Sequence, residues 1–153
     1  RFRRADGRLM AEFPAPQWFV ALGRLMAAEG ESFRRLGYAE LRFVVAMLDA
    51  DGKHLHDTAI EIDGYALTRV AALVDLPGFD PDFTICASAA VWHRMLEEIA
   101  HDGRPALRHT LSSLALVGDE LWLESTDQLR EDKFYRFNQT LQELLNLSGK
   151  LSR

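Results

Sequence analysis

Hydrophobic positions near the start of the chain repeat at the three- and four-residue intervals of a helix. The residues in this stripe are Trp18, Phe19, Leu22, Leu25 and Met26. Pro14 and Pro16 suit the opening turn of such a helix, and Gly30 marks its end. The segment 31–37 (ESFRRLG) then predicts one further short turn of helix that ends at Gly37.

Strand-like segments follow this helical region. Residues 39–48 (AELRFVVAML) and 54–63 (HLHDTAIEID) are rich in β-branched and apolar residues, and the segment 49–53 (DADGK) between them has the composition of a hairpin loop longer than two residues. Gly64 separates the second segment from 65–74 (YALTRVAALV). Three consecutive antiparallel strands are the simplest interpretation.

Turn residues at 77–81 (PGFDP) separate these strands from a short fourth one at 82–88 (DFTICAS). Ser88 is placed to cap a helix that ends at 101–105 (HDGRP), before a short helix or loop at 106–111. The apolar stripe of the capped helix consists of Val91, Trp92, Met95, Leu96 and Ile99.

The last third of the chain predicts one more strand and one long helix. We expect the fifth strand over 111–117, through Leu114, Leu116 and Val117, before the turn at Gly118 and Asp119. Residues 128–147 predict a single amphipathic helix, and Gly149 its stop. Its buried side is expected to carry Phe134, Phe137, Leu141, Leu144 and Leu145. The fold class predicted is α+β, with about five mainly antiparallel strands covered by helices.

The length of 153 residues predicts one domain with a sizeable core. Met10 looks like a natural start, so we expect residues 1–9 to be a leader or an added extension and 10–153 to be a single domain. The chain has no apolar run of the ~18 residues that would predict a membrane span.

The formal charge of −5 and a pI of about 5.5 argue against general attraction to nucleic acid or to anionic membranes. The single cysteine, Cys86, excludes an internal disulfide and fits a reducing compartment. The C-terminal letters KLSR differ from the peroxisomal address SKL. We therefore expect a cytoplasmic location.

Residues that could carry chemistry are few and scattered. His54 and His56 lie two apart on a predicted strand and should share a face, whereas Asp57 should point to the other face, so no metal site is predicted. We interpret Cys86 as a small buried apolar residue. The sequence contains no nucleophile elbow, phosphate loop or dinucleotide fingerprint, so no catalytic residue and no cofactor are predicted. The remaining histidines are interpreted as surface or capping residues: His93, His101 and His109.

The apolar content suggests a cavity between the helices and the sheet. Trp92, Trp122, Phe134 and Phe137 are bulky residues on segments expected to converge there, where large side chains can leave gaps. Asn138 lies in or beside the apolar stripe of the last helix. A buried amide needs a partner, either backbone or water, or else it marks the mouth of a pocket for a mostly apolar ligand.

Residues 82–119 resemble the second half of the sterol carrier protein 2 (SCP2-like) family. The resemblance is carried by these motifs: Asp82-Phe83-Thr84-Ile85, Ala87-Ser88, Trp92, Pro105-Ala106-Leu107 and Leu116-Val117-Gly118-Asp119. It implies a five-stranded sheet covered by helices that enclose an apolar tunnel for sterols, fatty acids or fatty acyl-CoA. The chain departs from the family pattern in having HTLSS at 109–113 in place of a Gly-Lys-like step, and in its longer C-terminal helix.

From this resemblance and the apolar content we expect a binding or carrier domain for an apolar small molecule or lipid. We expect no catalytic residues, cofactor, metal, nucleic-acid partner or integral membrane contact. A homodimer is compatible with the sequence. The predicted cavity lining is Phe43, Val45, Met47, Phe83, Ile85, Trp92, Leu96, Leu116, Trp122, Phe134, Phe137, Asn138 and Leu141.

Two alternatives stay open at this point. One is a small cavity enzyme of the isomerase or cyclase type with a desolvated carboxylate, for which the candidates are Asp57, Glu61, Asp63 and Asp75. The other is a dimerisation or partner-binding module that uses the C-terminal helix and exposes a large apolar patch.

Overall fold

The computed structural model describes residues 12–151, so the leader predicted at 1–9 lies outside the described residues. The elements are α1 (Pro16–Ala28), α2 (Gly30–Leu36), β1 (Ala39–Leu48), β2 (His54–Gly64), β3 (Ala66–Ala72), the 3₁₀ turn η1 (Leu73–Asp75), β4 (Phe83–Ser88), α3 (Ala89–Asp102), η2 (Leu107–His109), α4 (Leu111–Val117), β5 (Leu121–Glu124), α5 (Gln128–Arg136), α6 (Asn138–Asn146) and η3 (Leu147–Lys150).

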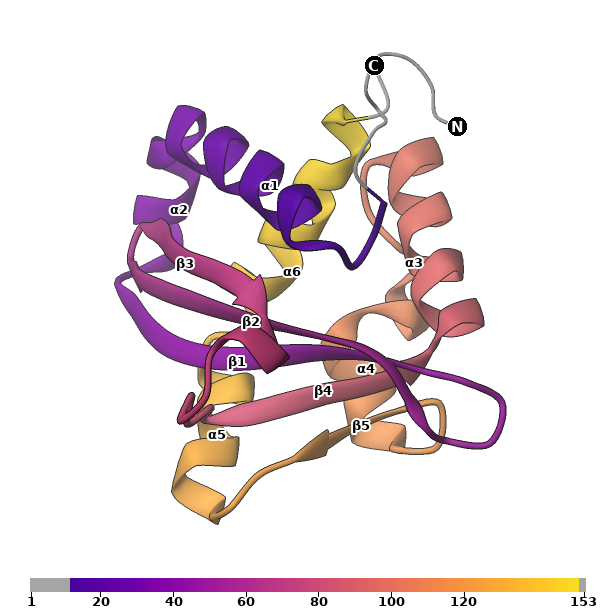
Figure 1. Cartoon of the computed structure of the whole chain (residues 1–153). Coiled ribbons are helices and arrows are strands. Elements are labelled where there is room, and N and C mark those ends of the chain that lie inside the picture. The colour runs from indigo at the N-terminus through magenta and orange to yellow at the C-terminus, as the bar shows by residue number, and fades with distance from the viewer. Residues whose placement is uncertain (1–11, 152–153) are drawn as a thin grey trace.

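The five strands form one sheet in the order β3-β2-β1-β4-β5 (Figure 1). The β1–β2, β2–β3 and β4–β5 pairs are antiparallel, and β1–β4 is parallel. The predicted α+β class, with a mainly antiparallel five-stranded sheet and three consecutive antiparallel strands, is therefore confirmed. The loop after β1 is built on Asp49, whose carboxylate accepts the N–H groups of Asp51 and Lys53, while Gly52 takes a positive φ of 83°.

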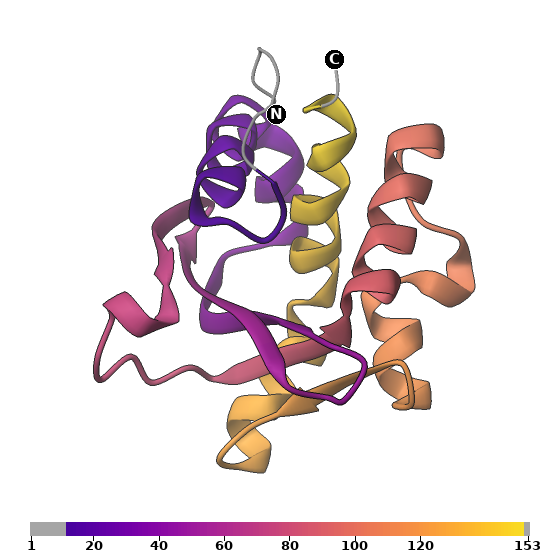
Figure 2. The ribbon, with the colours of Figure 1, turned by 45° about the vertical axis from the view of Figure 1, so that its right-hand side comes forward.

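Helices α1, α6 and α3 stand side by side on one face of the sheet (Figures 1 and 2). The alternation of β1 directs Leu41, Phe43, Val45 and Met47 toward these helices, where they join the main apolar core. The opposite face of β1 begins with the polar Glu40 and Arg42 and becomes apolar further along the strand. The main core of the described chain therefore lies on one side of the sheet, under these three helices.

Local capping explains where α3 begins and ends. The Ser88 hydroxyl accepts the N–H of Val91 at 3.3 Å, as the sequence predicted, and Gly103 adopts a left-handed conformation after the last turn. Three apolar side chains of α3, those of Trp92, Met95 and Ile99, are fully buried.

The prediction of a fifth strand over 111–117 is wrong, because this segment is helix α4 and the fifth strand is β5 at 121–124. Thr110 caps α4 by accepting the N–H of Ser113 at 3.2 Å. Leu111 and Leu114 are buried at a helical interval of three, while Leu116 and Val117 are exposed. The composition of so short a run does not by itself distinguish a strand from two turns of helix.

The single long helix predicted over 128–147 is also wrong, because Phe137 (φ −110°, ψ 19°) interrupts it and leaves two helices, α5 and α6. Gly149 lies within η3 and does not simply stop a helix. A Cβ at this position would come within 3.1 Å of the Ile99 carbonyl oxygen, so glycine allows η3 to approach α3 closely. None of the helices within residues 12–151 has the length and hydrophobicity that a membrane span needs.

Candidate ligand-binding site

Buried apolar side chains of the described residues pack between the sheet and helices α1, α3 and α6. This apolar interior contains a cavity of about 10 Å³, lined by Phe19, Phe43, Val45, Ile85, Trp92, Leu111, Leu141, Leu144 and Leu145. Such a volume suits about one water molecule, whereas pockets for small molecules measure roughly 300–1,000 Å³. This void, formed by described residues, is therefore far smaller than a lipid-sized pocket.

Five of the residues predicted to line a cavity meet around this small void: Phe43, Val45, Ile85, Trp92 and Leu141. The indole N–H of Trp92 donates to the carbonyl oxygen of Ala46 at 3.0 Å, and this bond fixes the ring between α3 and β1.

Other predicted lining residues belong to the same core without lining the void. Met47, Phe83 and Phe134 are buried, and the Phe83 and Phe134 rings meet edge to face with centroids 5.6 Å apart. Leu96 and Phe137 are partly buried against this core.

Leu116 and Trp122, which were also predicted to line the cavity, lie outside this core. Leu116 is 76% exposed on the solvent side of α4. Trp122 packs with Ala46, Leu48 and Cys86 on the other face of the sheet, because its neighbours Leu121 and Leu123 take the core side of β5. The misplaced fifth strand accounts for both positions.

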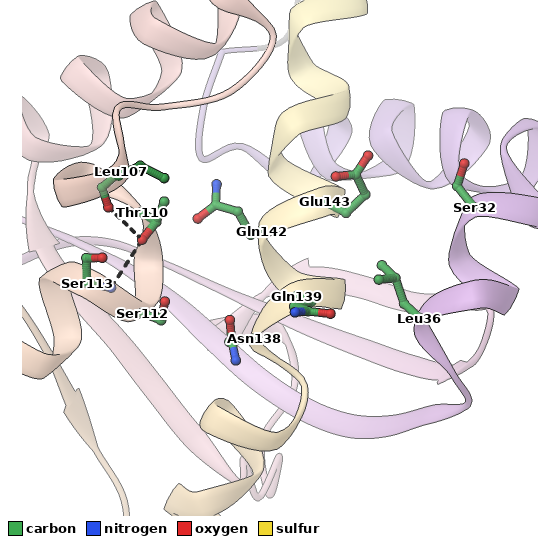
Figure 3. Close-up of a pocket in the computed structure, with 10 residues that line it drawn as sticks. All are labelled: Ser32, Leu36, Leu107, Thr110, Ser112, Ser113, Asn138, Gln139, Gln142 and Glu143. Atoms are coloured by element: carbon green, nitrogen blue, oxygen red, sulfur yellow. Dashed lines mark hydrogen bonds between the residues drawn. The ribbon is translucent and has the colours of Figure 1, made fainter.

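An open groove of about 530 Å³ lies on the outer side of α6 (Figure 3). It is bounded by α2 on one side and by η2 and α4 on the other. Polar uncharged side chains dominate this lining, and the two leucines stand at opposite walls. The lining residues are Ser32, Leu36, Leu107, Thr110, Ser112, Ser113, Asn138, Gln139, Gln142 and Glu143.

Asn138, the amide singled out in the sequence, is one of these lining residues. Its side-chain N–H donates to the backbone carbonyl of Tyr135 at 2.7 Å, so the amide is partnered by backbone at the break between α5 and α6. This bond spans Phe137 and therefore helps to stabilise the interruption of the helix.

Helix α6 separates the groove from the interior void. Its groove side carries Asn138, Gln139, Gln142 and Glu143, whereas Leu141, Leu144 and Leu145 line the void; this division follows the helical period. The open groove and the interior void therefore lie on opposite sides of helix α6.

Gln142 links α6 to the neighbouring helix α4 through a hydrogen bond. Its side-chain oxygen accepts the backbone N–H of Leu111 at 2.8 Å, and its side-chain N–H donates to the Asn146 oxygen at 3.1 Å. Sequence reasoning missed both Gln142 and Leu111. The three-residue interval between Leu111 and Leu114 could have indicated the inward face of α4.

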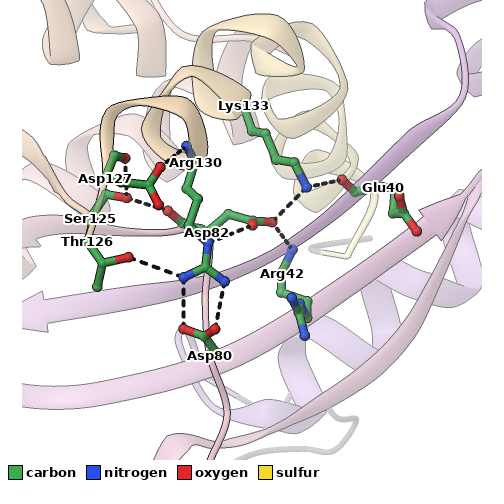
Figure 4. Close-up of polar contacts among 9 residues, drawn as sticks. All are labelled: Glu40, Arg42, Asp80, Asp82, Ser125, Thr126, Asp127, Arg130 and Lys133. Atoms are coloured by element: carbon green, nitrogen blue, oxygen red, sulfur yellow. Dashed lines mark hydrogen bonds and ion pairs between the residues drawn. The ribbon is translucent and has the colours of Figure 1, made fainter.

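A second polar cluster surrounds Asp82, the first residue of the motif at 82–85 (Figure 4). Asp82 is 3% exposed, and its carboxylate accepts the backbone N–H of Arg42 at 2.9 Å and is paired with Lys133 at 3.3 Å. Arg130 approaches Asp82 at 3.7 Å and binds Asp80 through two hydrogen bonds, which lowers the pKa of the Asp80 carboxyl. The carboxylate of Asp82 is well partnered, so its role is to hold the start of β4 against β1 and α5.

The expected geometry of the histidine pair is wrong. A register irregularity between Met47 and Leu48 pairs His56 with Met47, on the core side, but His54 with Leu48, on the other side. The two histidines therefore do not share a face. His54 instead meets Asp57, with 2.6 Å between its Nδ1 and a carboxylate oxygen.

The carboxylates considered for a cavity enzyme do not reach the apolar interior. Asp57, Glu61 and Asp63 lie on the sheet face opposite the core, and Asp75 is exposed in η1. The partner-binding alternative expected an apolar patch on the C-terminal helix, but the apolar side of α6 is buried. Neither alternative gains a supporting observation among the described residues.

Comparisons with known proteins define the fold more closely. No protein-family model and no curated protein matches the sequence. The structure is similar to the crystal structure of sterol carrier protein 2, with a TM-score of 0.62 and 22% identity over 91% of this chain and 98% of that one. It is also similar to the solution structure of a conserved hypothetical protein of Thermus thermophilus, described as possibly a sterol carrier protein, with a TM-score of 0.57 and 20% identity over 92% and 90% of the two chains.

The sheet order and the helical layer define a small α+β domain with an apolar interior on one side of the sheet. Within that class, the chain has an SCP2-like fold. The fold predicted from the resemblance at 82–119 is confirmed.

Proposed function

We propose that this domain binds or carries an apolar ligand, whose apolar part would occupy the space between the sheet and helix α6. The observation that carries the proposal is the position of α6, which separates an interior void lined only by apolar side chains from an open groove of about 530 Å³. Similarity to the structure of sterol carrier protein 2, and to one described as possibly a sterol carrier protein, supports the same class of ligand.

Entry of a ligand requires α6 and α4 to separate. Opening would break the hydrogen bond between Gln142 and the Leu111 N–H and part the apolar contacts of Leu111 and Leu141. The hydrogen bond contributes about 0.5–1.5 kcal/mol net, and the ligand would restore apolar burial at roughly 25 cal/mol per Å². The break at Phe137 provides a joint about which α6 could move without α5.

The lining of the groove favours an uncharged polar head group. Hydroxyl and amide side chains dominate it, Glu143 is its one acidic residue, and no lysine or arginine is among the ten lining residues. Anionic phosphate groups are normally met by Arg, Lys or helix N-terminal N–H groups. Among sterols, fatty acids and fatty acyl-CoA, we therefore favour a sterol or another lipid with a hydroxyl head.

Binding is tested by titrating the purified protein with a fluorescent sterol and, separately, with a fatty acid and a fatty acyl-CoA. We expect saturable binding of the sterol, tighter than that of the acyl-CoA, with energy transfer from the buried Trp92. The absence of saturable binding of all three probes would overturn the proposal. Preferential binding of the acyl-CoA would overturn only the argument about the head group.

A pair of leucine substitutions tests whether the interior is the site. Leu141→Ala removes three carbon atoms beside the void, whereas Leu116→Ala makes the same chemical change on an exposed side chain. We expect Leu141→Ala to change the affinity or the rate of sterol binding at least several-fold and Leu116→Ala to leave both unchanged. Equal behaviour of the two variants would place the ligand outside the interior.

A further inference from the structure

Three side chains with metal-ligating atoms converge on the sheet face turned away from the core. A ring nitrogen of His54, the sulfur of Cys86 and a carboxylate oxygen of Glu124 all lie within 4.8 Å of one another. They come from β2, β4 and β5, so the sheet brings together residues that are far apart in the sequence.

The strand register explains this convergence. Ala46 of β1 is paired with Asp57 of β2 on one side and with Cys86 of β4 on the other. The only side chain between Asp57 and Cys86 on this face is therefore the methyl group of Ala46. The irregularity after Met47 turns His54 onto the same face as Asp57. Glu124 lies two residues beyond Trp122, the partner of Cys86, and therefore shares this face too.

We propose that His54, Cys86 and Glu124 form a binding site for a divalent metal ion of the zinc class. Sulfur, imidazole nitrogen and carboxylate oxygen are the donor types that zinc takes, and the thiolate disfavours calcium and magnesium, which prefer oxygen donors alone. Three protein ligands leave a fourth tetrahedral position for a water molecule.

Asp57 has the role of a positioning residue in this site. Its carboxylate lies 2.6 Å from Nδ1 of His54 and can accept the Nδ1–H, which leaves the lone pair of Nε2 free for a metal. A carboxylate that accepts a hydrogen bond from a ligating histidine in this way fixes the tautomer and the orientation of the ring.

The three ligating residues differ in their exposure to solvent. Cys86 is completely buried, while His54 and Glu124 are exposed above it. An ion arriving from solvent would meet the histidine and the carboxylate first. The Cys86 sulfur would then bind it, and the thiol proton would pass to the solvent, so that one S–H bond is replaced by one metal–sulfur bond. The site lies on the opposite face of the sheet from the proposed lipid site and does not depend on it.

The test uses the full chain without affinity-tag histidines, reduced and freed of metal by a chelator. Titration with Zn²⁺ against a chromophoric chelator is expected to give one ion per chain, and Co²⁺ is expected to give the near-ultraviolet absorption of a thiolate-bound ion. Cys86→Ala and His54→Gln should each weaken zinc binding at least about 10-fold. Cys86→Ala should also remove the thiolate band of the cobalt complex, and His54→Gln should remove its tetrahedral spectrum. Asp57→Asn should weaken binding by about 10- to 100-fold.

His56→Gln is the matched control, since His56 is exposed, two residues from His54 and paired with Met47 on the other face. Its zinc affinity should equal that of the unmodified chain. No zinc binding by the unmodified chain, a cobalt complex without a thiolate band, or equal losses in His54→Gln and His56→Gln would overturn the proposal. The cobalt spectrum of the unmodified chain decides the matter even if a Cys86 variant fails to fold.

Discussion

Removal of the buried Asp82 carboxylate should destabilise the fold more than removal of the exposed Asp80 carboxylate, although both carboxylates contact Arg130. Asp82 precedes β4 and makes two hydrogen bonds with Arg42: its backbone N–H donates to the Arg42 carbonyl at 2.7 Å, and its carboxylate accepts the Arg42 N–H at 2.9 Å. Asp82→Ala keeps the first bond and deletes the second. It also leaves Lys133 without its buried carboxylate partner.

The magnitude follows from burial. A hydrogen bond to a buried charged acceptor such as the Asp82 carboxylate contributes about 1.5–3 kcal/mol. The Lys133 and Arg130 side chains are 28% and 24% exposed, so water can rehydrate them, and each lost ion pair costs at most about 1 kcal/mol. We therefore expect Asp82→Ala to lower the free energy of unfolding by about 2–4 kcal/mol, which corresponds to a fall in Tm of about 5–15 °C for a chain of this length.

Urea unfolding followed by tryptophan fluorescence measures this loss. Asp80→Ala is the matched control, because Asp80 binds the same Arg130 but its side chain is 61% exposed, and its removal should cost less than about 1 kcal/mol. Asp82→Asn, which can still accept the Arg42 N–H, should fall between the two. Losses in Asp82→Ala and Asp80→Ala that agree within about 0.5 kcal/mol would refute the argument from burial.

Three further predictions concern single side chains of the core and of the helix caps. Burial raises the pKa of the Cys86 thiol to about 12, whereas the thiol of the unfolded chain titrates near 8.5, so unfolding releases a proton between these pH values. The free energy of unfolding of the metal-free protein should therefore fall, relative to that of Cys86→Ala, by about 1–2 kcal/mol by pH 10. Parallel pH profiles of the two proteins would contradict this. Trp92→Phe leaves the Ala46 carbonyl without the indole donor and should lower the free energy of unfolding by about 1–3 kcal/mol in chemical denaturation. An unchanged denaturation midpoint would rule out a structural role for this bond. Ser88→Ala removes the cap of α3 and should lower stability by about 1 kcal/mol, while Ser88→Asp, which also caps, should recover most of it in thermal unfolding.

Three predictions that depended on neighbouring residues alone were confirmed. The helical stripe of α1, the hairpin loop after β1 and the cap at Ser88 each follow from interactions within a few residues, such as the bond from the Val91 N–H to Ser88. The resemblance over 82–119 predicted the correct fold, and the first residue of its first motif, Asp82, is a buried carboxylate with partners on both β1 and α5.

Predictions about short or interrupted segments were wrong for identifiable reasons. The run 111–117 has the composition of a strand, but Thr110 caps it as a helix and its leucines at 111 and 114 pack inward at a helical interval. The pattern over 128–147 suits one continuous helix. The break at Phe137 separates two helices that pack against different parts of the fold, with Phe134 against Phe83 and Leu141 beside the interior void.

Periodicity and turn chemistry act over short distances along the chain, and they were enough to predict the α+β class, the first four strands and most of the buried apolar residues. How completely those residues fill the interior follows from the packing of separate elements against one another, which no local pattern specifies. The meeting of His54 with Cys86 and Glu124 is likewise a property of the folded sheet, because one irregularity in the β1–β2 register changes the face to which a side chain points.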